Sequence, residues 1–410
     1  MVKRIIVIFT LCILCAGCWE KKELEEQAYV VVIGLDKADE KGKIIVTFQI
    51  SNPQVGSVQK GDAGNESASE IVTFKATDLL TAREIANAFI TRDISFNHMR
   101  NLVVSEELAK SDMLLRTIYS TLRERQLKRD IRLIVCKEEA KEFIRNNSPT
   151  FETRPHKYYQ FMIRQVTDMG FSPTSTLHEY FLTAEGDADL FLSILATTKE
   201  ESGSGDNEDE YKAGQIDKEG GNKTQIMGSA VFKEGKMIGT ITAEETRLSY
   251  ALNNTANILK MLVTYEDPIK KDYRVAARLM KTGETKVKMN LETKTPIIDV
   301  EVPFSLELLA IPSLVDYVQN KENQTLLKNS IEASLEKKTM KFIKQFQEEY
   351  KGQPFAWSLI ARKHFLTLSE YKEYNWMKTF PKAKVNVKFN VDITEFGEEL
   401  RTPNIPKIKD

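Results

Sequence analysis

The stretch KVNVKFNVDI, residues 384–393, carries the clearest structural signal in the sequence. Apolar and polar residues alternate along it, and the apolar positions are Val385, Val387, Phe389, Val391 and Ile393. Since successive side chains of a β-strand point to opposite faces, this alternation predicts a strand with one buried and one solvated face. A sheet with one buried face needs a second layer, and helices are a common solution.

An amphipathic helix is predicted upstream of this strand. Its apolar residues recur at spacings of four and seven, which places them on one helical face. They are Leu327, Ile331, Leu335, Phe342 and Phe346. We interpret this face as packing on a sheet, with a dimerisation or membrane face as the alternative.

Two further stretches alternate in the same way, at residues 287–291 and 298–304. Together with the helix and the final strand they predict a C-terminal α+β domain over residues 283–397, followed by a tail over residues 398–410. The last strands of the chain look antiparallel in this interpretation.

The first half of the chain alternates between strand and helix patterns. Strands are predicted at 29–35, 43–50, 101–104 and 131–136, and helices at 77–92, 111–125, 138–146 and across most of 153–195. In the helix over 77–92 we expect Leu79, Ile85, Ala86 and Phe89 to face inward. This alternation predicts an N-terminal α/β domain over residues 18–198.

The middle of the chain differs in composition. Residues 199–223 are rich in Glu, Asp, Gly and Ser, with GSGDNEDE at 203–210, and predict a flexible acidic linker or loop. Residues 224–282 contain a hairpin signal and then a helical pattern, which predict a small middle α+β domain. The predicted fold class is therefore α+β, with three domains that each have helices packed on a mixed or antiparallel sheet.

Residues 1–17 have the pattern of a lipoprotein signal peptide. Lys3 and Arg4 precede an apolar run of about a dozen residues, and Ala16-Gly17-Cys18 follows. We expect cleavage before Cys18, whose thiol would carry a diacylglyceryl group and whose new amino terminus would be acylated. Cleavage as an ordinary secretory signal is the alternative. A lipid on Cys18 would hold the chain on the extracytoplasmic face of a membrane.

The four cysteines fit this interpretation. Cys12, Cys15 and Cys18 form a C-x-x-C-x-x-C run that resembles a metal-ligand motif, but its apolar surroundings provide no polar shell for a metal. Cleavage would remove the first two and modify the third. Cys136 would then have no partner for an intrachain disulfide, and we expect it to lie in the core.

Composition and motif searches exclude several functions. The 410 residues include 58 Lys and Arg and 59 Asp and Glu, so no net basic field favours nucleic acid as a partner. The sequence contains no GxSxG, HExxH, GxGxxG or Walker motif. The four histidines, at 98, 156, 178 and 364, lack the spacing of metal ligands. We predict no catalytic residue, no metal site and no cofactor.

The start of the mature chain is similar to a known family. Cys18-Trp19-x-x-x-Glu23-Leu24, followed by a strand that ends in Gly34-Leu35-Asp36, resembles the Ger(x)C family, the C-subunit lipoproteins of spore germinant receptors. The resemblance continues in order along almost the whole chain. It includes Phe96-x-His98-x-Arg100, Arg129-Asp130-Ile131-Arg132, Gly228-x-Ala230-Val231-Phe232-Lys233 and Trp376.

This resemblance implies a non-enzymatic, lipid-anchored subunit on the outer face of the inner spore membrane of an endospore-forming bacterium. It further implies assembly with two integral membrane subunits, A and B, in a receptor that responds to small nutrients. Whether the C subunit itself binds a ligand stays open.

Two other functions remain as alternatives. One is the extracellular substrate-binding lipoprotein of a transporter, which would need two lobes of alternating strands and helices around a cleft. The other is a secreted hydrolase.

Overall fold

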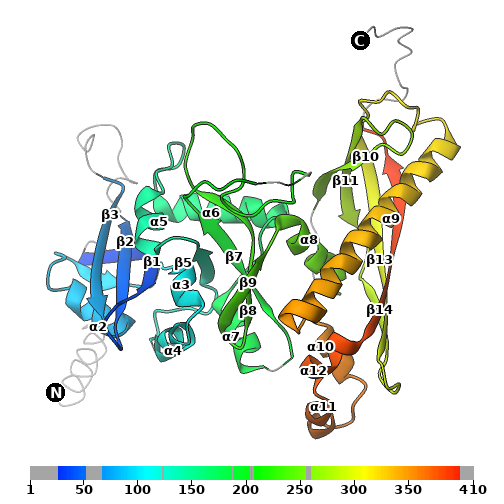
Figure 1. Ribbon diagram of the computed structural model, residues 1–410. Helices are drawn as coiled ribbons and strands as arrows, with labels where there is room; N and C mark the ends of the chain where they lie inside the picture. Colours follow the sequence, from blue (N-terminus) through cyan, green and yellow to red (C-terminus); the bar gives the residue numbers. More distant parts are fainter. Residues whose placement is uncertain are drawn as a thin grey trace, which may run out of the picture.

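The computed structural model describes residues 26–51, 67–121, 124–186, 188–203, 205, 207–254 and 260–397. The predicted signal peptide at 1–17, the lipid-attachment residue Cys18 and the predicted tail at 398–410 lie outside the described residues. The strands of the described chain form two sheets that lie side by side, each with its own helices (Figure 1).

The first sheet has nine strands among the described residues. They are β1 (Gln27–Lys37), β2 (Ile44–Ser51), β3 (Ser69–Ala76), β4 (Asp93–Ser95), β5 (Asn101–Ser105), β6 (Arg132–Cys136), β7 (Phe191–Thr197), β8 (Gln225–Lys233) and β9 (Lys236–Ile241). Their order is β3-β2-β1-β5-β6-β7-β8-β9, with the short β4 paired to β1. The four central strands β1, β5, β6 and β7 are parallel, and antiparallel strands flank them on both sides.

Helices cover both faces of this sheet. One face packs against α5 (Ala140–Asn146) and α6 (Pro155–Asp168). The other packs against α2 (Leu79–Ala86), α3 (Glu106–Ala109), α4 (Met113–Ser120) and α7 (Leu177–Glu185). Burial on both faces explains why the sequences of the central strands are nearly continuous apolar runs, such as VVVIGL and LVV.

Gly34 and Asp36 fix the position of α5 on the sheet. A Cβ at Gly34 would lie 3.2 and 3.3 Å from the Cβ atoms of Thr47 and Ala140 and 2.7 Å from Cδ1 of Ile144, so glycine allows the close approach of the helix. The Asp36 carboxylate, 1% exposed, accepts hydrogen bonds from the backbone N–H groups of Ala140 (2.6 Å) and Lys141 (3.1 Å). Burial raises the pKa of Asp36, and these bonds to the start of α5 oppose that shift. The Gly34-Leu35-Asp36 pattern therefore docks a helix.

The second sheet has five strands among the described residues. They are β10 (Met261–Glu266), β11 (Arg274–Lys281), β12 (Lys286–Asn290), β13 (Ile297–Ala310) and β14 (Lys384–Glu395). The long β13 pairs antiparallel with β11 and β12, and it pairs parallel with β14. The sequence predicted antiparallel strands here, but a parallel pair is possible because a long helical crossover joins β13 to β14.

That crossover begins with α9 (Lys321–Gln345), which lies along β14 (Figure 1). Its predicted stripe is buried, including Leu327 and Ile331. The side chains of Glu332 and Glu336 accept hydrogen bonds from backbone N–H groups of β14, at 2.8 and 3.2 Å. The helix thus satisfies donors that an edge strand would otherwise leave open.

Shorter elements complete the chain between α9 and β14. They are a π-helical turn (Phe346–Tyr350), α10 (Trp357–Arg362), α11 (Leu368–Tyr374), α12 (Trp376–Thr379) and a 3₁₀ turn (Phe380–Lys382). The Trp357 side chain is fully buried, and its Nε1 donates a hydrogen bond to the carbonyl of Leu252, at 3.0 Å. This bond ties the second unit to the end of α8 (Ala243–Leu252).

The α+β class is confirmed, but residues 224–282, predicted as a separate middle domain, contribute strands to both sheets. β8 and β9 complete the first sheet, and β10 and β11 begin the second. A two-stranded hairpin is at best marginally stable alone, so each pair gains stability by joining a larger sheet. The helix α8 lies between the sheets and contacts both β8 and β13.

The described residues between 199 and 223 are also more ordered than their composition suggests. We expected a flexible acidic linker, whereas Ala213 is fully buried and Asp209 is 2% exposed. Asp209 accepts a hydrogen bond from Arg247 of α8 at 2.7 Å, and its carbonyl accepts one from the N–H of Glu244. A buried ion pair and backbone hydrogen bonds, such as that from the N–H of Ala213 to the carbonyl of Met227, therefore anchor the described part of this segment.

Arg247 is the centre of the joint between the two units. Its guanidinium donates to Asp209, to the carbonyl of Met169 at the end of α6 and to the carbonyl of Leu262 in β10. It also lies over the ring of Phe171, 4.4 Å from the centroid. One side chain thus contacts both sheet units and the 199–223 segment.

Two predicted inward residues of the helix over 77–92 are exposed. Ile85 is 38% exposed and Phe89 is 53% exposed, whereas Leu79 and Ala86 are buried as predicted. The helix α2 ends at Ala86, so Phe89 lies beyond it and stacks edge-on against Phe74 of β3. Similarly, the mainly helical prediction for 153–195 missed the start of β7.

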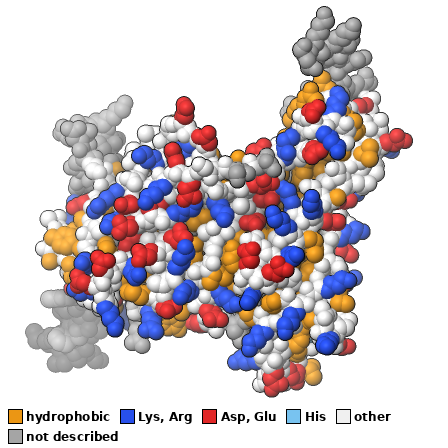
Figure 2. Space-filling model, viewed as in Figure 1, with side chains coloured by type: hydrophobic (Ala, Val, Ile, Leu, Met, Phe, Trp, Pro, Cys, Tyr) orange, Lys and Arg blue, Asp and Glu red, His pale blue; other side chains and the backbone are white. Residues whose placement is uncertain are grey.

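The surface in Figure 2 shows acidic and basic side chains interspersed, in agreement with a formal net charge of −1. None of the helices in the described part of the chain is both long and apolar enough to cross a membrane.

Candidate functional site

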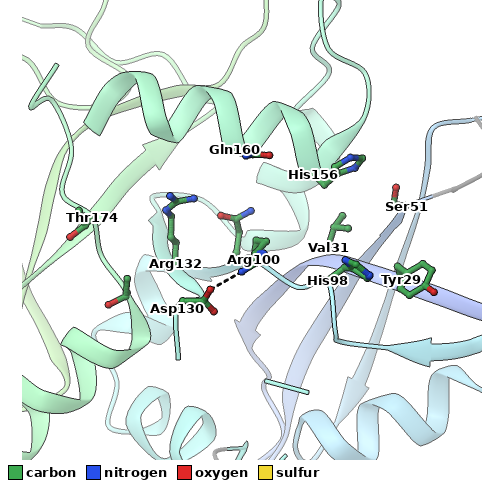
Figure 3. A pocket seen from close by; sticks show the side chains of 12 residues that line it. Tyr29, Val31, Ser51, His98, Arg100, Asp130, Arg132, His156, Gln160 and Thr174 are labelled. Carbon is green, nitrogen blue, oxygen red and sulfur yellow. Dashed lines mark hydrogen bonds and ion pairs between the residues drawn. The ribbon is translucent and has the colours of Figure 1, made fainter. Parts of the chain in front are cut away.

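A cavity of about 690 Å³ opens beside α6, at the amino ends of the parallel strands β5 and β6 (Figure 3). We call it the α6 cavity. The floor consists of buried or half-buried side chains: Tyr29, Val31, Ser51, Asn101, Arg132 and Thr176. The rim consists of exposed side chains: His98, Arg100, Asp130, His156, Gln160 and Thr174.

Strand register brings the two central floor residues together. Asn101 and Arg132 are opposite each other in the parallel pair β5–β6. Because strand side chains alternate, Asn101 shares its face with Val103, and Arg132 shares its face with Ile134. Those two apolar residues belong to the core under α5 and α6. The cavity therefore lies on the same face of the sheet as this core, at the strand ends where polar residues replace the apolar ones.

An ion pair holds one side of the rim. Arg100 and Asp130 precede β5 and β6, and the Arg100 Nη1 donates to Asp130 Oδ2 at 2.7 Å. Both side chains are at least half exposed, so this pair contributes little to stability. It does neutralise most of the charge that Arg100 could offer a ligand. On the other side, the ring of His98 meets Tyr29 edge-on, with centroids 4.7 Å apart.

Two arginines line the cavity. Arg100 is paired with Asp130, whereas Arg132 forms no ion pair with any described residue. Partial burial and the nearby Arg100 cation lower the pKa of its guanidinium, which nevertheless stays charged at neutral pH. Figure 3 shows its side chain extending toward α6, where Gln160 and His156 lie. Partial burial and the cations Arg154 and Lys157 lower the pKa of His156, so its ring is mainly neutral at pH values around neutrality.

Two polar atoms of the floor have no hydrogen-bond partner among the described residues. They are the hydroxyl oxygen of Tyr29 and the amide oxygen of Asn101, and Asn101 is only 2% exposed. An unsatisfied buried polar group costs about 1–3 kcal/mol. Both atoms are almost fully shielded from solvent, so they lie beneath the surface that a molecule in the cavity would touch.

The carboxyl ends of the same strands are closed by the chain itself. Asp36 binds the start of α5, and Glu138 accepts hydrogen bonds from Thr197 Oγ1 (2.5 Å) and from the N–H of Thr198 (2.6 Å). In open α/β sheets this edge is the usual ligand site. In the described chain the open cavity lies at the opposite edge.

Sequence reasoning missed the α6 cavity. It treated the histidines as isolated, but the structure brings His98 and His156 to one rim, while His178 and His364 are exposed elsewhere. The sequence did offer one signal for this site: Arg100 directly precedes the strand β5, and Arg132 begins the strand β6. The described residues contain no group of three or more His, Cys, Asp or Glu side chains that could hold a metal.

The two remaining predictions about cysteine have different outcomes. Cys136 is fully buried, as predicted, and burial raises the pKa of its thiol. The lipid attachment at Cys18 falls outside the described residues and stays a prediction.

Comparisons with known proteins place the chain in a family. Residues 20–197 match the model described as the spore germination protein N-terminal domain, and residues 227–397 match the model described as spore germination B3/GerAC like, C-terminal. The second model begins within β8, the strand that completes the first sheet. The family boundary and the boundary between sheets are therefore not the same.

Relatives in Bacillus subtilis (strain 168) agree with this assignment. The chain is 24% identical to the putative spore germination protein YfkR over 260 residues, which span 62% of this chain and 61% of the relative. It is 20% identical to the spore germination protein B3 over 400 residues, which span 96% of this chain and 97% of the relative.

A solved structure shares the fold. The crystal structure of the GerBC protein aligns with a TM-score of 0.53 and 16% identity, covering 88% of this chain and 96% of that one. The two family matches, in order and over most of the chain, support a role in spore germination. The chain belongs to the Ger(x)C family of spore germination proteins.

Proposed function

We propose that this chain is the non-enzymatic C subunit of a nutrient germinant receptor. In this proposal the lipid on Cys18 holds it on the outer face of the inner spore membrane, where it works with the integral membrane subunits A and B. The observation that carries the proposal is the match of both family models, in order, over residues 20–197 and 227–397.

Two observations support this proposal. The lipoprotein signal pattern of residues 1–18 supplies a lipid attachment at the amino terminus. The α6 cavity also lacks the hydrogen-bonded pair of nucleophile and base that covalent catalysis requires, among the described residues that line it.

The transporter alternative fits the structure less well. A transport-binding protein closes two lobes around its ligand. The α6 cavity is instead lined by one sheet and the segments packed on it, and the second sheet contributes no residue to its lining.

The proposal is tested by deleting the gene in a strain whose other germinant-receptor genes have been removed. We expect the spores to lose their response to the nutrients that trigger germination in the parent strain, because a receptor complex without its C subunit is incomplete. The measurement is the fall in optical density of a spore suspension after nutrient addition. Re-introduction of the intact gene serves as the control, and a full nutrient response without the gene would refute the proposal.

A further inference from the structure

We propose that the α6 cavity is a binding site for a small organic carboxylate, which the Arg132 guanidinium holds above a floor formed by Asn101, Tyr29 and Val31. This inference concerns a property of the chain itself and does not depend on the receptor role. A chain that binds no carboxylate could still be a receptor subunit, and the two proposals fail in different experiments.

The size of the cavity sets the scale of the ligand. Its volume of about 690 Å³ lies within the range of about 300–1,000 Å³ that is usual for small-molecule sites. The cavity has a buried floor and an exposed rim, so a ligand could enter without a rearrangement of the sheet.

Charge selects an anion. Arg100 is engaged by Asp130 at 2.7 Å, whereas Arg132 has no ion pair within the described chain. A guanidinium presents a planar fork of donors that matches a carboxylate with two parallel hydrogen bonds. The pKa of Arg132 is lowered first by burial and then by the Arg100 cation, and an anion at this point would offset both effects.

The floor selects an organic ligand. Val31 and Tyr29 also line the cavity, and Figure 3 shows Tyr29 on the side away from Arg132. Inorganic phosphate could bind the guanidinium but would leave the apolar surface uncovered.

The test titrates the purified full-length chain with sodium L-malate at neutral pH by isothermal calorimetry, in buffers matched for ionic strength. Glycerol is the uncharged control and inorganic phosphate the inorganic one. We expect saturable malate binding, much weaker phosphate binding and no glycerol binding. Absence of saturable malate binding, or tighter binding of phosphate, would overturn the proposal.

Three variants locate the site. Arg132→Gln should weaken malate binding about tenfold or more, because it removes the charged fork. Asp130→Asn should strengthen binding several-fold, because it removes a negative charge from the rim and frees Arg100. Arg164→Gln is the matched control: it removes the same charge from an exposed position on α6 (side chain 75% exposed), and it should leave the affinity unchanged.

Urea unfolding of each variant shows whether it folds. If Arg132→Gln does not fold, the malate affinity of Asp130→Asn tests the proposal instead, because misfolding would not strengthen binding. Equal affinity in Arg132→Gln and the intact chain, or no gain in Asp130→Asn, would contradict the assignment of this cavity.

Discussion

Replacing Cys18 by alanine is expected to move the protein from the membrane fraction to the soluble fraction of spore lysates and to weaken nutrient-triggered germination. The variant has no thiol to carry a diacylglyceryl group. Each buried methylene of an acyl chain contributes about 0.8 kcal/mol of membrane binding, and stable anchoring generally needs two signals. The nearly neutral chain offers no strong charge attraction in place of the lipid. Immunoblots of membrane and soluble fractions measure the effect.

Two further variants make this test specific. If the apolar leader of the Cys18 variant were not cleaved, it would itself retain the protein at the membrane. A second variant therefore replaces residues 1–18 with a secretory leader that is cleaved without attachment of a lipid. Cys136→Ala is the control, because it removes a fully buried cysteine that carries no lipid. Cys136→Ala should stay in the membrane fraction. The A and B subunits could themselves hold the protein at the membrane, so this variant is tested in a strain that lacks both. Retention of the leader-swapped protein at the membrane of that strain would show that Cys18 is not the anchor.

Replacing Arg247 by alanine is expected to lower the free energy of unfolding by about 3–5 kcal/mol, the cost of breaking a buried ion pair from one side. The side chains of Arg247 and Asp209 are only 5% and 3% exposed, and their nitrogen and oxygen atoms lie 2.7 Å apart. Without the guanidinium, the Asp209 carboxylate stays buried without its cation, and the carbonyls of Met169 and Leu262 each lose a donor. Urea unfolding curves of the full-length chain measure the change.

The controls separate this ion pair from general effects of losing an arginine. Arg164→Ala removes an exposed arginine that pairs with Asp168 at 3.7 Å, and it should change the free energy of unfolding by less than about 1 kcal/mol. The double variant Arg247→Leu with Asp209→Leu should recover part of the loss, because apolar residues can replace a buried ion pair. A loss in Arg247→Ala no larger than that in Arg164→Ala would contradict the role of Arg247 as the joint.

Local patterns in the sequence predicted most of the individual elements. The alternation at 384–393 became β14, and the stripe that includes Leu327 and Ile331 became the buried face of α9. These predictions succeed because the period of a hydrophobic pattern reports directly on burial of one face. The roles of Gly34 and Asp36, by contrast, could not be predicted from the sequence. They follow from the contacts that both residues make with α5.

The assembly of the elements was harder to predict. Nothing in the hairpin of β8 and β9 shows that it joins the sheet of β1, because strand pairing depends on contacts between residues far apart in the chain. The ion pair of Asp209 and Arg247 joins positions 38 residues apart, so composition alone read residues 199–223 as flexible. The α6 cavity was missed for the same reason, since its residues come from six separate segments.

The central claim is that this chain is the C subunit of a three-subunit membrane receptor. Affinity purification of the tagged, full-length chain from detergent-solubilised inner spore membranes tests it most directly, with mass spectrometry of the eluate. We predict that two integral membrane proteins, the A and B subunits, elute with the intact chain in comparable amounts. They should be absent from a parallel purification of an untagged strain. Elution of the chain alone, or together with the permease of a transporter, would contradict the account.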